Sequence, residues 1–84
     1  MKANNKYNGH KNWNHWNVSL WLNNDETLYR RMMLCVHRSR TLDIAARLLK
    51  DLLHHDENTE TPDGAPYTIS SIRASMVGIK EQAW

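Results

Sequence analysis

The sequence predicts an all-α fold, a compact bundle of about four short helices. Apolar residues recur at helical spacing in four separate stretches, no stretch shows the period-two alternation of a half-buried strand, and phenylalanine is absent. A chain of 84 residues has room for one hydrophobic core, so residues 1–84 are expected to form a single helical domain. Within it we expect a polar arm over residues 1–11 and an acidic, turn-rich loop over residues 54–67.

The first helix is predicted from the stretch KNWNHWNVSLWLNND, which begins at Lys11 and holds three of the chain's four tryptophans. At 100° per residue, one stripe of this helix collects three apolar side chains and has a fourth on its flank: Trp13, Trp16, Leu20 and Trp21. A buried indole removes on the order of 150–250 Å² from water. We therefore predict that these side chains form the core and that this helix lies at the centre of the bundle. The alternative is a surface on which nucleic-acid bases stack, beside amides and the lysines of the arm.

Asparagines occur at both ends and in the middle of the same predicted helix. Asn12 is the expected N-cap, and Asn23 and Asn24 can end the helix because asparagine tolerates the left-handed conformation. Asn17 falls about 40° from Trp13 on the helical wheel, inside the aromatic stripe. A buried amide needs hydrogen-bond partners, so we predict that Asn17 bonds the backbone of a neighbouring loop or helix end and fixes how the helices dock.

The second helix is expected to begin at Asp25 and Glu26, where negative charge meets the positive end of the helix dipole. Its predicted apolar arc consists of Leu28, Tyr29, Met32, Met33, Cys35 and Val36. Because Cys35 is the chain's single cysteine, it excludes an internal disulfide and fits a reducing cytoplasm. Its place on the apolar arc indicates an inert core thiol.

The tripeptide SRT separates the second helix from a third, for which Thr41 is the expected N-cap. The apolar residues of the third helix follow i, i+3, i+4, i+7 spacing: Leu42, Ala45, Ala46, Leu49, Leu52 and Leu53. The sequence TPDG then predicts a turn. A fourth helix is expected from about Thr68 or Ser70, with a narrow apolar stripe of Ile69, Ile72, Met76 and Ile79. Gly78 should weaken that helix by roughly 1 kcal/mol unless a neighbouring backbone packs on it.

The net charge of the chain is small, but the charged residues are clustered along the sequence. Eleven basic and nine acidic side chains give a net charge of +2, too little to indicate a nucleic-acid-binding protein by charge alone. Four arginines lie within eleven residues and four carboxylates within eight: Arg30, Arg31, Arg38 and Arg40, then Asp56, Glu57, Glu60 and Asp63. We therefore expect a molecular dipole with a basic and an acidic pole. No apolar run approaches the ~20 residues of a membrane span, and the N-terminal stretch lacks the apolar region of a signal peptide, so we expect a cytoplasmic protein.

The sequence carries no recognisable catalytic, metal or cofactor motif. Its five histidines and one cysteine include no pair at Cys-x-x-Cys or His-x₃-His spacing. A nucleophile elbow, a glycine-rich phosphate loop and a carboxylate pair in apolar surroundings are also missing. We therefore expect a protein that is not an enzyme and that binds no cofactor or metal.

The polar face of the second helix is the best candidate for a partner-binding surface. Arginine is enriched at interaction hot spots, and an exposed leucine ringed by arginines can fill a partner's pocket. The same arginines could instead bind phosphate, or simply form a solvated face. The candidate residues are Arg30, Arg31, Leu34, His37 and Arg38, with Lys6 and Lys11 of the arm in second place.

The block NWNHWNVSLWLNNDETLYR, from Asn12 to about Arg30, resembles a motif of small proteins encoded by phages and plasmids. In those proteins, whose function is unassigned, an Asn-aromatic-x-x-Trp-Asn-Val element precedes a Leu-Trp pair and an Asn-Asp/Glu turn. The resemblance covers roughly a quarter of the chain and supplies no catalytic residues. It implies a mobile-element accessory protein that acts on a bacterial host.

These observations lead to three functional hypotheses. The first is a stoichiometric, protein-binding inhibitor of a bacterial defence complex, of the anti-CRISPR or anti-restriction type, that acts in the host cytoplasm. The second is a small nucleic-acid-binding or transcription-regulating protein, in which the second and third helices resemble a helix-turn-helix without its usual glycine. The third is a self-associating structural protein.

Overall fold

A computed structural model of the chain describes residues 11–83, and the side chains among them as far as Ile79. Four helices occur in this part of the chain: α1 (Trp13–Asn24), α2 (Glu26–Arg38), α3 (Leu42–His55) and α4 (Ile69–Ala83). The all-α class and the four helices are confirmed. The candidate residue Lys6 lies outside the described residues. No helix in the described part is long and apolar enough to cross a membrane.

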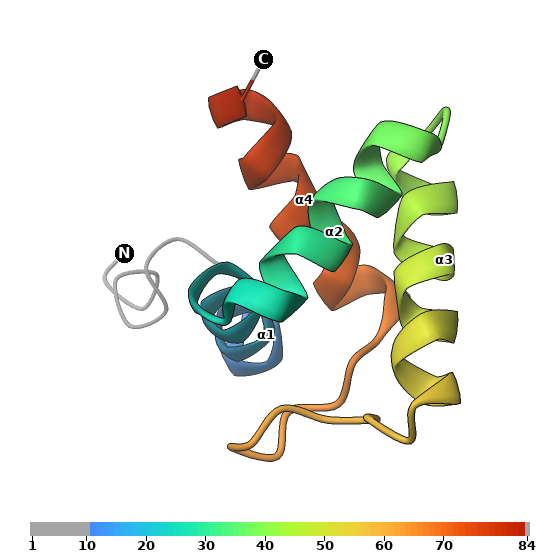
Figure 1. The fold of residues 1–84 in the computed structure, drawn as a ribbon. Coiled ribbons are helices and arrows are strands. Elements are labelled where there is room, and N and C mark those ends of the chain that lie inside the picture. The colour runs from blue at the N-terminus through green and yellow to red at the C-terminus, as the bar shows by residue number, and fades with distance from the viewer. Residues whose placement is uncertain (1–10, 84) are drawn as a thin grey trace, which may run out of the picture.

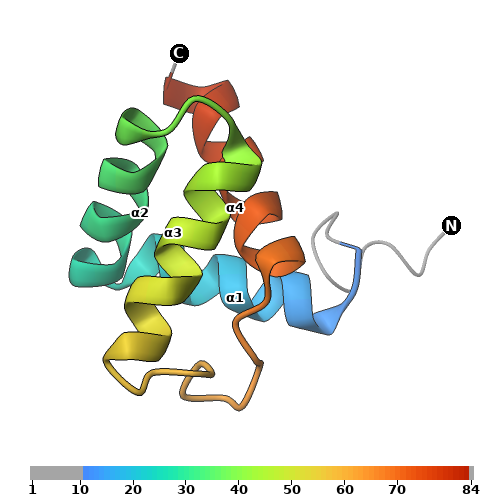
Figure 2. The same ribbon diagram turned by 90° about the vertical axis from the view of Figure 1, so that its right-hand side faces the viewer.

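The helices pack in a ring, in which α1 contacts α2, α2 contacts α3, α3 contacts α4, and α4 returns to α1 (Figure 1). In the second view α1 runs crosswise to α3 and α4, and the connection from α3 to α4 passes below them (Figure 2). Each helix therefore packs mainly on two others, and α1 does not occupy the centre that we predicted for it.

Short polar side chains fix the helix starts as the sequence predicts. The Asn12 side chain accepts the backbone N–H of His15 at 3.0 Å, and the Thr41 hydroxyl accepts that of Ile44 at 3.1 Å. At the start of α4, Thr68 and Ser71 form a reciprocal pair, each side-chain oxygen accepting the other residue's backbone N–H.

The end of α1 differs from the prediction. The helix stops where Asp25 adopts an extended backbone, with φ −96° and ψ 120°, and no asparagine in the described residues is left-handed. Asp25 serves both helices, since its backbone N–H donates to the Trp21 carbonyl and its side chain caps α2 by accepting the Leu28 N–H at 3.0 Å. The extended cap makes the sharp corner between α1 and α2.

The hydrophobic core is aliphatic and lies between the inner faces of the four helices. Its largest fully buried apolar side chains are Val18 and Leu22 of α1, Met32 and Cys35 of α2, Leu49 and Leu53 of α3, and Ile72 and Met76 of α4. The narrow stripe of α4 and the core position of Cys35 are confirmed. Burial raises the pKa of the Cys35 thiol, with Arg31 and Arg38 acting in the opposite direction, so the thiol stays protonated at neutral pH.

The predicted tryptophan core is wrong. Trp13 is 39% exposed and Leu20 is exposed too, while Trp16 and Trp21 are only partly buried. The inward face of α1 is formed by its three buried residues, Asn17, Val18 and Leu22. Because α1 is apolar around most of its circumference, helical spacing does not determine which of its faces turns inward.

The connection between α3 and α4 begins at Asp56, since α3 extends to His55 and thus past the predicted loop boundary at residue 54. A Schellman motif ends α3: the Glu57 N–H donates to the His54 carbonyl, and the Asn58 N–H donates to the Leu53 carbonyl. Glu57 adopts the left-handed conformation that this motif needs, with a φ of 63°. The predicted turn is present: the Gly64 N–H donates to the Thr61 carbonyl at 2.8 Å, and the Gly64 φ is +93°.

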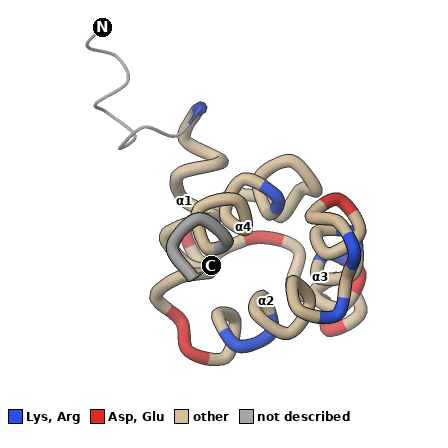
Figure 3. The backbone as a smooth tube through the Cα atoms, turned by 90° about the horizontal axis from the view of Figure 1, so that it is seen from above, with Lys and Arg blue, Asp and Glu red and all other residues tan. Residues whose placement is uncertain are grey.

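The predicted basic and acidic clusters are not fully separate, because one ion pair joins them. Arg31 of the basic cluster forms an ion pair with Asp56 of the acidic stretch, at 2.7 Å. Arg73 of α4 pairs with Asp43 of α3 at 2.6 Å. Figure 3 shows basic and acidic segments side by side along α3. Tertiary folding therefore brings together charges that the sequence keeps apart.

Replacing Gly78 by alanine is expected to raise the free energy of unfolding by about 1 kcal/mol, because alanine is the better helix former. A Cβ added at Gly78 meets nothing within 4 Å, so no close backbone approach requires the glycine. Gly64→Ala is the matched control: the positive φ disfavours a side chain, and stability should fall by about 1 kcal/mol or more. Chemical denaturation measures both; a destabilised Gly78→Ala variant would contradict the prediction.

Candidate functional site

One polar row of α1 binds the connection between α3 and α4. Asn14, Asn17 and Trp21 are spaced i, i+3, i+7, so they lie on the same side of the helix. The Asn17 amide N–H and the Trp21 indole N–H both donate to Oδ2 of Asp63, each at 2.9 Å. The Asn14 amide donates to the Pro66 carbonyl at 2.8 Å. We call these three side chains and Asp63 the loop clamp.

Asn17 is the inner member of the loop clamp and is 2% exposed. Its carbonyl oxygen accepts the Thr61 hydroxyl at 2.6 Å, and the Thr61 oxygen in turn accepts the Ala65 N–H at 3.0 Å. The predicted contact of Asn17 with a neighbouring loop is thus present, but the amide bonds the loop's side chains and not its backbone. This network satisfies the buried amide and the interior of the turn together.

The loop clamp explains why amides and the Trp21 indole share one segment. An indole N–H and an amide N–H are both donors, and the exposed carboxylate at the tip of the TPDG turn accepts both. The block NWNHWNVSLWLNND therefore holds a loop that the sequence places more than 40 residues away. Nearby, Nε2 of His15 lies 2.9 Å from the Ser70 hydroxyl, a second link from α1 to the start of α4.

The free energy of unfolding should fall at low pH, because protonation of Asp63 weakens the loop clamp. Hydrogen bonds from Asn17 and then Trp21 hold the pKa of Asp63 below its ordinary value of 3.8. The ionised carboxylate therefore stabilises the fold above pH 3.8, and this contribution is lost as the pH falls through the lowered folded-state pKa. An Asp63→Asn variant should show a shallower decline of the thermal midpoint below pH 4. Equal declines for wild type and variant would contradict the assignment.

The second-helix face contains the predicted partner-binding residues, but not all of their charges are available. Arg30 pairs with Glu26 of the same helix, and Arg31 pairs with Asp56. The pair with Arg31 holds the pKa of Asp56 below its ordinary value. Leu34 is 49% exposed, and His37, Arg38 and Lys11 are also exposed, as predicted.

Sequence reasoning missed an apolar row on α3. Ile44 is 49% exposed, and Leu48 and Leu52 are exposed as well, although Leu52 was predicted to be a core residue. The three residues are four apart and so form one row along the helix, beside the buried arc of Ala45 and Leu49. Their spacing was visible in the sequence. The predicted apolar arc of α3 nevertheless included one residue too many, because Leu52 is exposed.

The row on α3 and the outer residues of α2 lie on two helices that pack against each other. Arg38 and Arg47 are exposed, and neither forms an ion pair within the described part of the chain. We call the exposed residues Leu34 and Arg38 of α2 and Ile44, Arg47, Leu48 and Leu52 of α3 the α2–α3 face. Apolar side chains with guanidinium groups are the composition of a protein-binding surface.

A pocket of about 570 Å³ opens on a different side, between the α1–α2 corner and the α3–α4 connection. Trp21, Leu28, Pro62 and Tyr67 supply its apolar lining, and three acidic residues and Arg31 supply its charges. Within residues 11–79, no group of three or more histidine, cysteine, aspartate or glutamate side chains is arranged to hold a metal ion.

The fold and its surfaces define a small all-α domain with an exposed apolar and arginine-bearing face. The chain belongs to a family of unknown function, DUF7249, whose model matches residues 3–83. No curated protein and no solved structure matches it.

Proposed function

We propose that this protein is a stoichiometric protein-binding inhibitor that acts by occupying a surface of its partner through the α2–α3 face. The observation that carries the proposal is the row of Ile44, Leu48 and Leu52, three aliphatic side chains left exposed on one helix of a domain this small. Single exposed apolar residues are ordinary, whereas aligned ones are typical of contact surfaces.

The charges around this row favour a protein over a nucleic acid. Arg30 and Arg31 already have carboxylate partners, which reduces the positive field that the second helix offers to phosphate. Among the described residues Arg38, Arg40 and Arg47 have no ion pair, and Arg38 and Arg47 lie on the two helices that carry the exposed leucines and isoleucine. A partner with an apolar groove and an acidic rim would complement this arrangement.

We further propose that the partner is a bacterial defence complex, of the CRISPR–Cas or restriction type, and that a phage or plasmid encodes the inhibitor. This part depends on the resemblance of the block from Asn12 to about Arg30 to mobile-element proteins. A small domain can act on such a complex by covering a surface that the complex needs.

Affinity capture from a lysate of a bacterial host, treated with nuclease, tests the proposal. The wild-type protein should retain a defence-complex subunit in a 1:1 ratio. Leu48→Asp and Arg38→Glu should lose it, because each places a carboxylate on the α2–α3 face. Leu20→Asp is the matched control, since Leu20 is similarly exposed but lies on α1; this variant should retain the subunit.

Two results would contradict the proposal. One is recovery of nucleic acid alone, with binding that weakens steeply as salt rises, which would favour a nucleic-acid-binding protein. The other is retention of the same subunit by the Leu48→Asp and Arg38→Glu variants, which would place the contact elsewhere. Circular dichroism of each variant confirms that it is folded before the comparison is made.

A further inference from the structure

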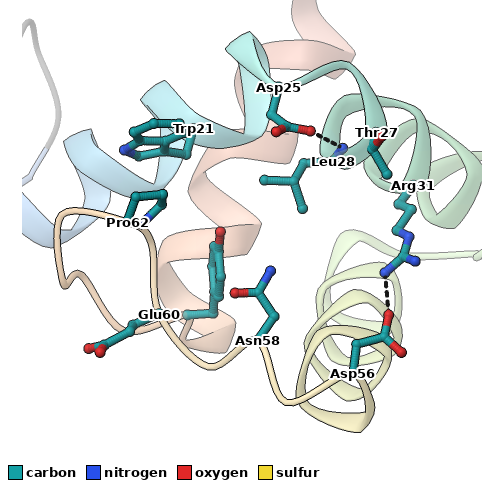
Figure 4. Close-up of a pocket in the computed structure, with 10 residues that line it drawn as sticks. Trp21, Asp25, Thr27, Leu28, Arg31, Asp56, Asn58, Glu60 and Pro62 are labelled. Atoms are coloured by element: carbon teal, nitrogen blue, oxygen red, sulfur yellow. Dashed lines mark hydrogen bonds and ion pairs between the residues drawn. The ribbon is translucent and has the colours of Figure 1, made fainter.

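The pocket beside the loop clamp combines an aromatic wall with carboxylates (Figure 4). Trp21 lies over Pro62 on one side, Leu28 projects from α2, and the Arg31–Asp56 pair closes the other side. Asn58 extends between these walls from the connection. The pocket is therefore built from α1, α2 and the connection together, and it depends on their docking.

Two polar groups that face this pocket have no hydrogen-bond partner among the described residues. Tyr67 lines it and is 2% exposed, yet its hydroxyl makes no hydrogen bond with any described residue. The Asn58 side-chain amide is likewise without a hydrogen bond in the described part of the chain. No buried side-chain nitrogen or oxygen among the described residues lacks a partner, so the unbonded Tyr67 hydroxyl is open to the pocket, where a ligand can reach it.

Apart from the ion pair between Arg31 and Asp56, the charged side chains that line the pocket are negative. Asp56 is neutralised by Arg31, which leaves the carboxylates of Asp25 and Glu60 without an ion pair among the described residues. One oxygen of Asp25 accepts the Leu28 N–H, and the other remains available as an acceptor. Glu60 lies at the rim with its carboxylate directed away from Asn58, so it adds negative potential more than a direct contact.

We propose that this pocket binds an organic cation, an ammonium or guanidinium group on an alkyl stem. The cationic head donates to Asp25, Asn58 and the Tyr67 oxygen, and the stem lies against Leu28 and the Trp21 ring. An indole face attracts a cation by its quadrupole, and a carboxylate accepts charge-assisted hydrogen bonds. A lysine or arginine side chain of a partner protein has this chemistry, and so does a free polyamine.

This site is separate from the α2–α3 face, so it does not depend on the proposed inhibitor function. If a partner protein supplies the cation, the pocket forms a second contact on the same molecule. Failure of one proposal leaves the other intact.

Titration of ¹⁵N-labelled protein with agmatine, an alkyl guanidinium, tests the inference by NMR. We expect saturable shifts of the Trp21 indole and Asn58 amide signals. Asp25→Asn, which can still cap α2, should weaken binding about tenfold or more because it removes the charge. Glu26→Gln is the matched control: it removes the adjacent carboxylate, which pairs with Arg30 and does not line the pocket, and should leave binding unchanged.

Two further experiments identify the source of the cation and the role of Tyr67. A short arginine-containing peptide that binds at least as tightly as agmatine assigns the pocket to a partner side chain, and weaker binding of the peptide assigns it to a free cation. Tyr67→Phe should weaken agmatine binding several-fold without loss of the fold. The inference is wrong if agmatine produces no saturable shift, or if the Asp25→Asn and Glu26→Gln variants bind agmatine equally. It is also wrong if citrulline, the neutral analogue of arginine, shifts the signals as strongly as arginine does.

Discussion

Replacing Leu49 by alanine is expected to lower the free energy of unfolding by about 3 kcal/mol, within the range of 2–5 kcal/mol typical for a buried leucine. Leu49 is fully buried in the aliphatic core between the four helices. The substitution removes apolar contacts and leaves a cavity that the surrounding helices fill only in part. In a domain of 84 residues this loss is a large fraction of the total stability.

The adjacent Leu48 provides the control for this experiment. It is 38% exposed, so Leu48→Ala should change the free energy of unfolding by at most about 1 kcal/mol, since less apolar surface returns to water. Urea denaturation of both variants measures the difference. Equal destabilisation by the two substitutions would mean that α3 does not turn Leu49 inward and Leu48 outward.

Replacing Asn17 by leucine is expected to lower the free energy of unfolding by about 2 kcal/mol. Leucine has a similar size but can neither donate to Asp63 nor accept the Thr61 hydroxyl, which are bonds of 2.9 and 2.6 Å. The Thr61 hydroxyl is then left buried without its acceptor. The connection between α3 and α4 should become more mobile, because its two side-chain links to Asn17 are gone.

Asn23→Leu is the corresponding substitution at the other end of α1. The Asn23 amide is exposed and bonds only within its own helix, to the Ser19 carbonyl and hydroxyl. Its replacement should change stability by no more than about 0.5 kcal/mol. An Asn17→Leu variant as stable as Asn23→Leu would show that the loop clamp contributes nothing to the fold.

The helix boundaries were largely predictable because local chemistry determines them. Asn12, Asp25 and Thr41 cap their helices through their own side chains, and such contacts span only three residues. The turn at Gly64 is similarly local. The inward face of α1 was not predictable, since apolar residues on both sides of that helix leave the choice to the partners that surround it.

Long-range pairings account for most of what the sequence did not reveal. The pairing of Arg31 with Asp56, and of Trp21 with Asp63, joins segments more than 20 residues apart. No local rule relates an indole on one helix to a carboxylate in a distant turn. For the candidate surface, the exposed Leu34 and Arg38 were identified from helical spacing, whereas the row on α3 emerged only with burial known.

Asp63 fastens the connection between α3 and α4 to α1, because it accepts the Asn17 amide N–H and the Trp21 indole N–H. Hydrogen exchange of the indole N–H groups tests it most directly, because Trp21 donates to Asp63 whereas Trp13 is exposed and has no such bond in the described chain. We expect slow exchange at Trp21, fast exchange at Trp13, and loss of the difference in an Asp63→Ala variant. Exchange at Trp21 as fast as at Trp13 in the wild-type protein would contradict it.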